Sequence, residues 1–286
     1  MNTANTEITT HKIIVIEWLS DKDDHTGQKL YEDVIRHKTS SSLLLSSEYH
    51  NANDANEFKN ILEQITYNHK DGQIVTLDIE THGSEYGIGI DSKESISWKE
   101  LFYLTRPINE NCGGLLVITL SCCFGLSHLI AIEPKERAPF LAIVSSNREM
   151  YPEELYDCFC EFFKRYENPL SIKEAMSGLH LSFAQQGKES PFALTTSLQW
   201  FDEFFREERI AQIAEQKASR LAHMEGIDEE CAKYQIIEDM LQLCRKHRSY
   251  FNFFDVLGID NVPKAYIVDS CEINKNLDTT SNAPNP

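Results

Sequence analysis

Short apolar runs alternate with amphipathic segments through the first two hundred residues of the chain. The runs are rich in β-branched residues, which predicts buried strands, and they occupy residues 12–19, 41–47, 73–83, 115–123, 139–147 and 192–200. Segments with helical spacing of apolar residues fall between most of them. Strands that alternate with helices form βαβ units. The sequence therefore predicts an α/β fold for residues 12–200, with a mostly parallel central sheet covered by helices on both faces.

The remainder of the chain has a different pattern. Residues 201–270 are predicted to form a charged helical region, which begins with one long helix over 201–223. Its apolar positions are expected to pack on the core while its charged positions face water, and a regulatory or partner-docking role is the alternative. The polar ends, residues 1–11 and 271–286, are predicted to be flexible.

Composition excludes several classes of function. The chain has 27 Lys and Arg against 45 Asp and Glu, a formal net charge of -18, so its surface repels a phosphate backbone and nucleic acid is not expected as a partner. The N-terminus lacks the apolar stretch of a secretory signal. Residues 113–132 are apolar, but they include Ser121, two cysteines and His128, which favours a buried strand and helix over a membrane span. Eight cysteines without a C-x-x-C pair indicate reduced thiols in a cytoplasmic protein, without a thiolate metal site.

Two of the predicted strands end in residues that carry reactive side chains. One ends in His82 and Gly83, and the other runs through Cys122 and Cys123 to Gly125. Functional groups of parallel sheets gather just past the carboxyl ends of the strands, and the gap between these two ends fits one strand–helix–strand unit. An imidazole activates a thiol for attack on an amide and later protonates the leaving amine. The backbone N–H groups of Gly83 and Cys123 are expected to hold the oxyanion.

The stretch "THGSEYGIGI…SWKELFYLTRPINENCGGLLVITLSCCFG" resembles the core of caspase-like cysteine peptidases, which include caspases, metacaspases, separases and bacterial CHAT domains. In that family one apolar strand ends in His-Gly and a later one ends in Cys followed shortly by Gly. The caspase signature Q-A-C-[RQG]-G lines up with residues 121–125, and Ser121 is closest to the CHAT pattern. Over residues 12–200 the resemblance implies a caspase-like sandwich and a catalytic dyad of His82 and Cys123. It also implies that Cys122 is buried and that the enzyme needs no metal or organic cofactor.

The resemblance further implies a cysteine endopeptidase that cleaves a protein substrate under the control of a protein activator. Small bacterial members act in regulated proteolysis or in antiviral defence. In caspases and metacaspases the residue two before the nucleophile helps to select the substrate side chain, as Gln or Asp respectively. Ser121 favours neither charge, so the cleavage preference stays open. The segment after the fifth strand offers Ser145 and Asn147 as further substrate-binding residues.

Several alternatives remain at this level. Asp78 and Glu80 share the strand parity of His82. One interpretation is that a carboxylate of this pair orients the imidazole, but we favour the interpretation that both form buried structural pairs. A metal site built from the three residues is less favoured. The same fold also serves as a catalytically idle scaffold or binding protein. A flavodoxin-like ligand-binding domain is disfavoured, because the loop after the first strand is acidic where a phosphate would need a glycine-rich cradle. The sequence does not specify the substrate, the activator, the oligomeric state or the source organism.

Overall fold

The computed structural model describes residues 10–69, 73–91, 93–132 and 136–247, and every structural statement below refers to them. The strands are β1 (His11–Trp18), β2 (Leu45–Asn51), β3 (Ile74–Gly83), β4 (Gly87–Gly89), β5 (Ser95–Ser97), β6 (Val117–Ser121), β7 (Ala142–Ser146) and β8 (Phe192–Thr196). The α-helices are α1 (Thr26–Leu30), α2 (Arg36–Ser40), α3 (Ala55–Asn68), α4 (Trp98–Asn111), α5 (Pro152–Arg165), α6 (Ile172–Gln185), α7 (Ser197–Phe204), α8 (Glu207–Glu225) and α9 (Glu229–His247). A π-helical turn, η1 (Tyr31–Ile35), joins α1 to α2, and two 3-10 segments are η2 (Gly125–Ala131) and η3 (Pro169–Ser171).

The central sheet is mixed and mostly parallel. Its strands lie in the order β2-β1-β3-β6-β7-β8, and only the pairing of β7 with β8 along this path is antiparallel. The short strands β4 and β5 form a hairpin that pairs with the end of β3. The predicted α/β fold with a mostly parallel sheet flanked by helices is therefore confirmed.

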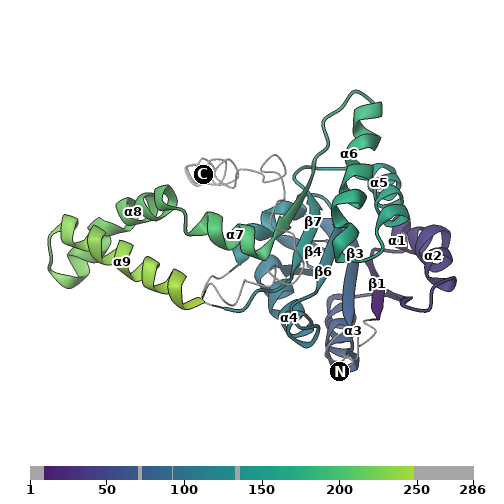
Figure 1. Cartoon of the computed structure of the whole chain (residues 1–286), viewed down its shortest axis with the longest axis horizontal. Helices are drawn as coiled ribbons and strands as arrows, with labels where there is room; N and C mark the ends of the chain where they lie inside the picture. Colours follow the sequence, from purple (N-terminus) through teal and green to yellow (C-terminus); the bar gives the residue numbers. More distant parts are fainter. Residues whose placement is uncertain (1–9, 70–72, 92, 133–135, 248–286) are drawn as a thin grey trace, which may run out of the picture.

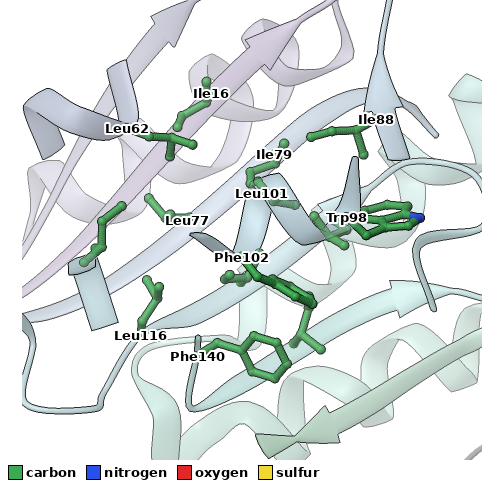
Figure 2. Packing of buried hydrophobic residues seen from close by; sticks show 14 of the residues in the cluster. Ile16, Leu62, Leu77, Ile79, Ile88, Trp98, Leu101, Phe102, Leu116 and Phe140 are labelled. Atoms are coloured by element: carbon green, nitrogen blue, oxygen red, sulfur yellow. The ribbon is translucent and has the colours of Figure 1, made fainter. Parts of the chain in front are cut away.

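Helices cover both faces of the sheet (Figure 1), and the sheet separates the apolar core into two clusters. Alternate strand residues point to opposite faces, so Ile14 and Ile16 join the cluster under α3 and α4, while Ile13 and Val15 join the cluster under α1, α5 and α6. Figure 2 shows part of the first cluster, with fully buried side chains from β1, α3, β3 and α4, among them Ile16, Leu62, Leu77, Ile79 and Leu101. We call these two sides of the sheet the α3/α4 face and the α5/α6 face.

The C-terminal region is helical, as predicted, but it does not begin with one long helix. Helix α7 ends at Phe204, and α8 begins at Glu207 after Arg206, which has extended backbone angles. Helices α8 and α9 pair as a hairpin that projects from the sheet, drawn in green and yellow in Figure 1. The predictions for residues 1–9, 248–270 and 271–286 lie outside the described residues.

Several predicted strand boundaries differ from the observed ones, and β8, for example, ends at Thr196 where residue 200 was predicted. Strand β1 starts at His11, whose buried imidazole bonds the carbonyl oxygen of Glu167 and the hydroxyl of Thr76, so this residue does not belong to a flexible end. Strand β2 starts at Leu45, several residues later than predicted, and it lies at the edge of the sheet. Within the described part of the chain, no helix is long and apolar enough to cross a bilayer.

Candidate active site

The ends of β3 and β6 lie side by side at one edge of the sheet. The two strands are parallel, and Glu80 pairs with Ser121 in the register. His82 and Cys123 each lie two residues further along, so they follow the same alternation toward the α5/α6 face. The Gly83 backbone touches the cysteine segment, because a Cβ atom built on Gly83 would lie 2.1 Å from the carbonyl oxygen of Cys123. A glycine is required there for the two strand ends to approach.

A pocket of about 70 Å³ opens at these strand ends, and we call it the strand-end pocket. His82 and Cys123 both line it, together with residues of the β1–α1 loop, β3, β6 and the start of α5. The complete lining is Leu19, Asp23, Asp24, Thr26, Glu80, Thr81, His82, Ser121, Cys123, Met150, Pro152 and Leu155. The structure therefore brings the predicted nucleophile and the predicted base to one cavity, whose volume suits the end of a single side chain.

The loop before α5 holds Cys123 in place. The backbone N–H of Met150 donates to Sγ of Cys123 at 3.4 Å, and the thiol lies 3.5 Å from the carbonyl oxygen of Met150. The N–H donor stabilises negative charge on the sulfur, whereas the carbonyl oxygen, to which the thiol donates, favours the protonated thiol. Phe124, the next residue, has φ 54° and is the one described non-glycine residue with positive φ. This left-handed turn directly after Cys123 is a sparsely populated conformation of the kind that gathers at functional sites.

The neighbouring thiol of Cys122 points to the opposite face of the sheet. Cys122 is fully buried in the cluster of the α3/α4 face, and its Sγ lies 2.9 Å from a Cβ built on Gly83. Burial raises the pKa of the Cys122 thiol. Cys123 is partly exposed and lines the pocket. The two adjacent cysteines therefore have different environments, one in the core and one at the cavity.

An acidic residue that the sequence analysis did not select contacts His82. Oδ2 of Asp23, in the loop after β1, lies 3.1 Å from Nε2 of His82, and the two side chains are 29% and 50% exposed. Partial burial acts to raise the pKa of Asp23, but the hydrogen bonds from Ser20 and the contact with His82 outweigh it and lower the pKa. The contact with Asp23 is made through Nε2 of the ring, and His82 also lines the pocket. Asp23 was missed because only the fold places the β1 loop beside β3.

Three buried carboxyl groups lie on the α5/α6 face at or beneath the pocket, and one of them, Glu80, lines it. Glu17 on β1 and Glu80 on β3 are paired in the register. Asp78 lies two residues before Glu80 on β3, so its side chain points to the same face further from the strand end. Burial raises the pKa of Asp78 to about 7, although hydrogen bonds from Thr119 and Ser121 act in the opposite direction. Burial and then the charge of Asp78 raise the pKa of Glu80 well above its ordinary value. The structure therefore places Asp78 and Glu80 in the interior, and Asp23 is the carboxylate that contacts the imidazole.

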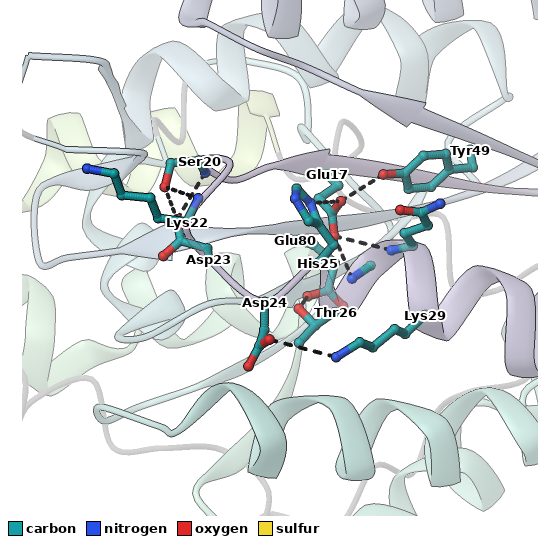
Figure 3. Close-up of polar contacts among 12 residues, drawn as sticks. Glu17, Ser20, Lys22, Asp23, Asp24, His25, Thr26, Lys29, Tyr49 and Glu80 are labelled. Carbon is teal, nitrogen blue, oxygen red and sulfur yellow. Dashed lines mark hydrogen bonds and ion pairs between the residues drawn. The ribbon is translucent and has the colours of Figure 1, made fainter.

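The carboxylate of Glu17 accepts hydrogen bonds from backbone N–H groups of the first turn of α1 (Figure 3). Its Oε1 accepts from the backbone N–H of Gly27 at 2.8 Å and of Gln28 at 3.2 Å, while Oε2 contacts the hydroxyl of Tyr49 and the imidazole of His25. Helix N-termini bind phosphate through such free amides. A carboxylate of the chain therefore already occupies the free amides at the start of α1.

The predicted substrate-binding residues lie in different places. Ser121 is buried and lines the strand-end pocket beside Glu80. Ser145 does not line it, because its position in β7 faces the other side of the sheet, where its Cβ lies 2.7 Å from a Cβ built on Gly125. Asn147 is exposed in the loop after β7, and its backbone N–H donates to the carbonyl of Pro191. Of the three, the structure brings Ser121 alone to the cavity.

The backbone amides predicted to hold the oxyanion, those of Gly83 and Cys123, lie on the two touching strand ends. Gly83 pairs with Ile88 of the β4–β5 hairpin. The segment after Gly83 is also held by the indole N–H of Trp98, which donates to the carbonyls of Ser84 and Glu85 at 3.2 Å.

Within the described ranges, no group of three or more His, Cys, Asp and Glu side chains could hold a metal ion. No family model matches this chain, and no curated protein matches it.

Proposed function

We propose that the chain is a cysteine endopeptidase of the caspase-like type, in which Cys123 is the nucleophile and His82 the general base and acid. The observation that carries the proposal is the presence of both side chains in the lining of one cavity at the ends of neighbouring parallel strands. The order of the motifs along the chain, His-Gly before Cys, agrees with the resemblance to that group. The proposed setting is regulated proteolysis or bacterial defence, under a protein activator.

In the first half of the proposed reaction, His82 accepts the thiol proton and the sulfur of Cys123 attacks the carbonyl carbon of the scissile bond. The backbone N–H groups of Gly83 and Cys123 stabilise the oxyanion that forms. The imidazolium then gives its proton to the departing amine, the C–N bond breaks, and a thioester remains on Cys123.

In the second half, His82 removes a proton from water, and the hydroxide attacks the thioester carbonyl. The C–S bond breaks, the carboxylic acid product leaves, and the thiol is restored. Asp23 contributes by contacting Nε2 of His82 at 3.1 Å, which orients the ring and stabilises its positive charge. The amide of Met150, which donates to Sγ, stabilises the thiolate.

Profiling of protein N-termini in cells that express the full chain tests this function. We expect new N-termini with the wild-type protein and none with Cys123→Ala or His82→Ala. Cys231→Ala, which changes an exposed thiol on α9, is the matched control and retains them. The absence of new N-termini with the wild-type protein, or identical ones with Cys123→Ala, would favour the idle caspase-like scaffold.

A further inference from the structure

A turn that follows β7 contacts the cysteine segment through its backbone. The N–H of Phe124, the residue after the proposed nucleophile, donates to the carbonyl oxygen of Arg148 at 3.2 Å. The N–H of Met150 donates to Sγ of Cys123 at 3.4 Å, and the thiol lies 3.5 Å from the carbonyl oxygen of Met150. The place of the sulfur therefore depends on the backbone of residues 147–150, which we call the β7 turn.

One buried hydroxyl holds the β7 turn in its shape. Oγ of Ser146, the last residue of β7, donates to the carbonyl oxygen of Arg148 at 3.0 Å and accepts from the N–H of Arg148 at 3.2 Å. A serine that bonds the backbone two residues further along stabilises a turn. Ser146 is fully buried, so water does not compete for these bonds. The carbonyl oxygen of Arg148 thus accepts from both Ser146 and Phe124.

The rest of the β7 turn has few other restraints. Its start is fixed by β8, because Ser146 pairs with Phe192 and the N–H of Asn147 donates to the carbonyl oxygen of Pro191 at 3.1 Å. Residues 147–149 are exposed, so burial contributes little to their conformation. The two hydrogen bonds of the Ser146 hydroxyl therefore determine how the turn continues from β7 to Met150.

We propose that Ser146 is a positioning residue for the nucleophile. It fixes the β7 turn through the backbone of Arg148, and the turn sets the place of the Cys123 sulfur and supports the left-handed conformation of Phe124. Ser146 does not line the strand-end pocket, so it acts on the thiol only through the turn. The inference rests on the proposed endopeptidase function and adds a residue that does not touch the substrate.

The adjacent residue Ser145 offers a matched control. Both serines lie in β7 and are fully buried, but Oγ of Ser145 has no hydrogen-bond partner among the described residues. Replacement by Ala removes one buried hydroxyl at either position. Only at Ser146 does it remove the bonds that fix the turn.

The rate at which an electrophilic peptide labels Cys123 tests the proposal on the full chain. Adducts are quantified by mass spectrometry at a temperature where circular dichroism shows each variant to be folded. Ser146→Ala is expected to lower the rate about tenfold or more, because small displacements of a reacting atom are costly. Ser145→Ala is expected to retain the wild-type rate.

Two further measurements distinguish positioning from a loss of stability. Ser146→Thr keeps the hydroxyl and is expected to label close to the wild-type rate, whereas Ser146→Val, of similar shape without the hydroxyl, is expected to label as slowly as Ser146→Ala. Amide hydrogen exchange at Phe124 and Met150 is expected to be faster in Ser146→Ala and unchanged in Ser145→Ala. If the Thr and Val variants do not fold, the two alanine variants decide.

The outcomes separate this inference from the proposed function. Wild-type labelling of Ser146→Ala, or an equal loss of labelling in Ser145→Ala, overturns the inference while the peptidase function stands. Slow labelling of Ser146→Ala without faster exchange at Phe124 and Met150 also overturns it. Absence of labelling in the wild-type protein contradicts the proposed function and with it the positioning role.

Discussion

Nε2 of His82 lies 3.1 Å from Oδ2 of Asp23, although the two residues are 59 positions apart in the sequence and β2 and α3 lie between them. Asp23 is itself fixed, since its Oδ2 also accepts hydrogen bonds from the backbone N–H and hydroxyl of Ser20, at 2.9 and 2.7 Å. The imidazole is therefore oriented by an anchored carboxylate. His82 and Cys123 both line the strand-end pocket.

Replacement of Asp23 by Asn is expected to slow the labelling of Cys123 by an electrophilic peptide about tenfold or more, because the ring loses its orienting negative charge. Its effect on thermal stability is expected to be small, since the pair is half-exposed. Asp21→Asn changes an exposed carboxylate of the same loop and is expected to leave the rate unchanged. Equal rates for Asp23→Asn and the wild-type protein would remove Asp23 from the site.

Substitution of Gly83 by Ala is expected to destabilise the protein by about 1–3 kcal/mol and to abolish labelling of Cys123. The added methyl group would lie 2.1 Å from the carbonyl oxygen of Cys123 and 2.9 Å from Sγ of Cys122, so the strand ends must separate. Chemical denaturation and adduct mapping measure the two effects.

Gly178→Ala is the matched control for this substitution. A Cβ there meets the exposed side chain of Arg165, which is able to move, and lies 3.2 Å from the carbonyl oxygen of Glu161. The position is within α6, where alanine is favoured over glycine by about 1 kcal/mol. This variant is expected to remain close to wild-type stability. Normal labelling of Gly83→Ala would show that the two strand ends do not depend on close contact.

The buried carboxyl of Asp78 predicts a dependence of stability on pH. Burial raises its pKa to about 7 in the folded protein, whereas an unfolded Asp titrates near 3.9. Between these values the folded state binds more protons than the unfolded state, so this group makes the free energy of unfolding fall as pH rises from about 4 to about 7. The raised pKa of Glu80 acts in the same direction.

Asp78→Asn removes this contribution and keeps an oxygen that accepts from Thr119. We take the melting temperature of Asp78→Asn minus that of the wild-type protein. This difference is expected to be larger at pH 8 than at pH 5, by about 2 °C or more. Asp157→Asn, at an exposed position of α5, should give the same difference at both pH values. A difference for Asp78→Asn that is independent of pH, or that decreases toward pH 8, would contradict the buried and protonated state of Asp78.

The alternation of apolar runs predicted the sheet because each run must be buried on both faces, and β1, β3, β6 and β7 form where expected. The same pattern could not specify β4 and β5, which have three residues each and form only because they pair with the end of β3. The sequence pattern also did not predict that α7 ends at Phe204 and that a separate helix begins at Glu207. Phe201 and Phe205 both pack into the core, which a single straight helix pattern does not reveal.

The placement of His82 and Cys123 in the lining of one pocket could be predicted because both lie at the ends of strands that a short connection makes neighbours. Ser145 was predicted from its position after a strand, but its parity directs it to the α3/α4 face, which requires the register of β7 against β6. Asp23 comes from a loop without periodicity, so only the packed structure places it. Glu80 was expected to be structural, and its position in the pocket lining depends on how β6 and α1 enclose it.

The adjacent thiols allow the central claim to be tested most directly. After reaction of the full chain with an electrophilic peptide, mass spectrometry of the proteolytic fragments locates the adduct on wild type, Cys122→Ala, Cys123→Ala and His82→Ala. The account predicts an adduct on Cys123 in the wild-type protein and in Cys122→Ala, and loss of that adduct in Cys123→Ala and His82→Ala. An adduct on Cys122, or labelling of Cys123 at the wild-type rate when His82 is absent, would contradict it.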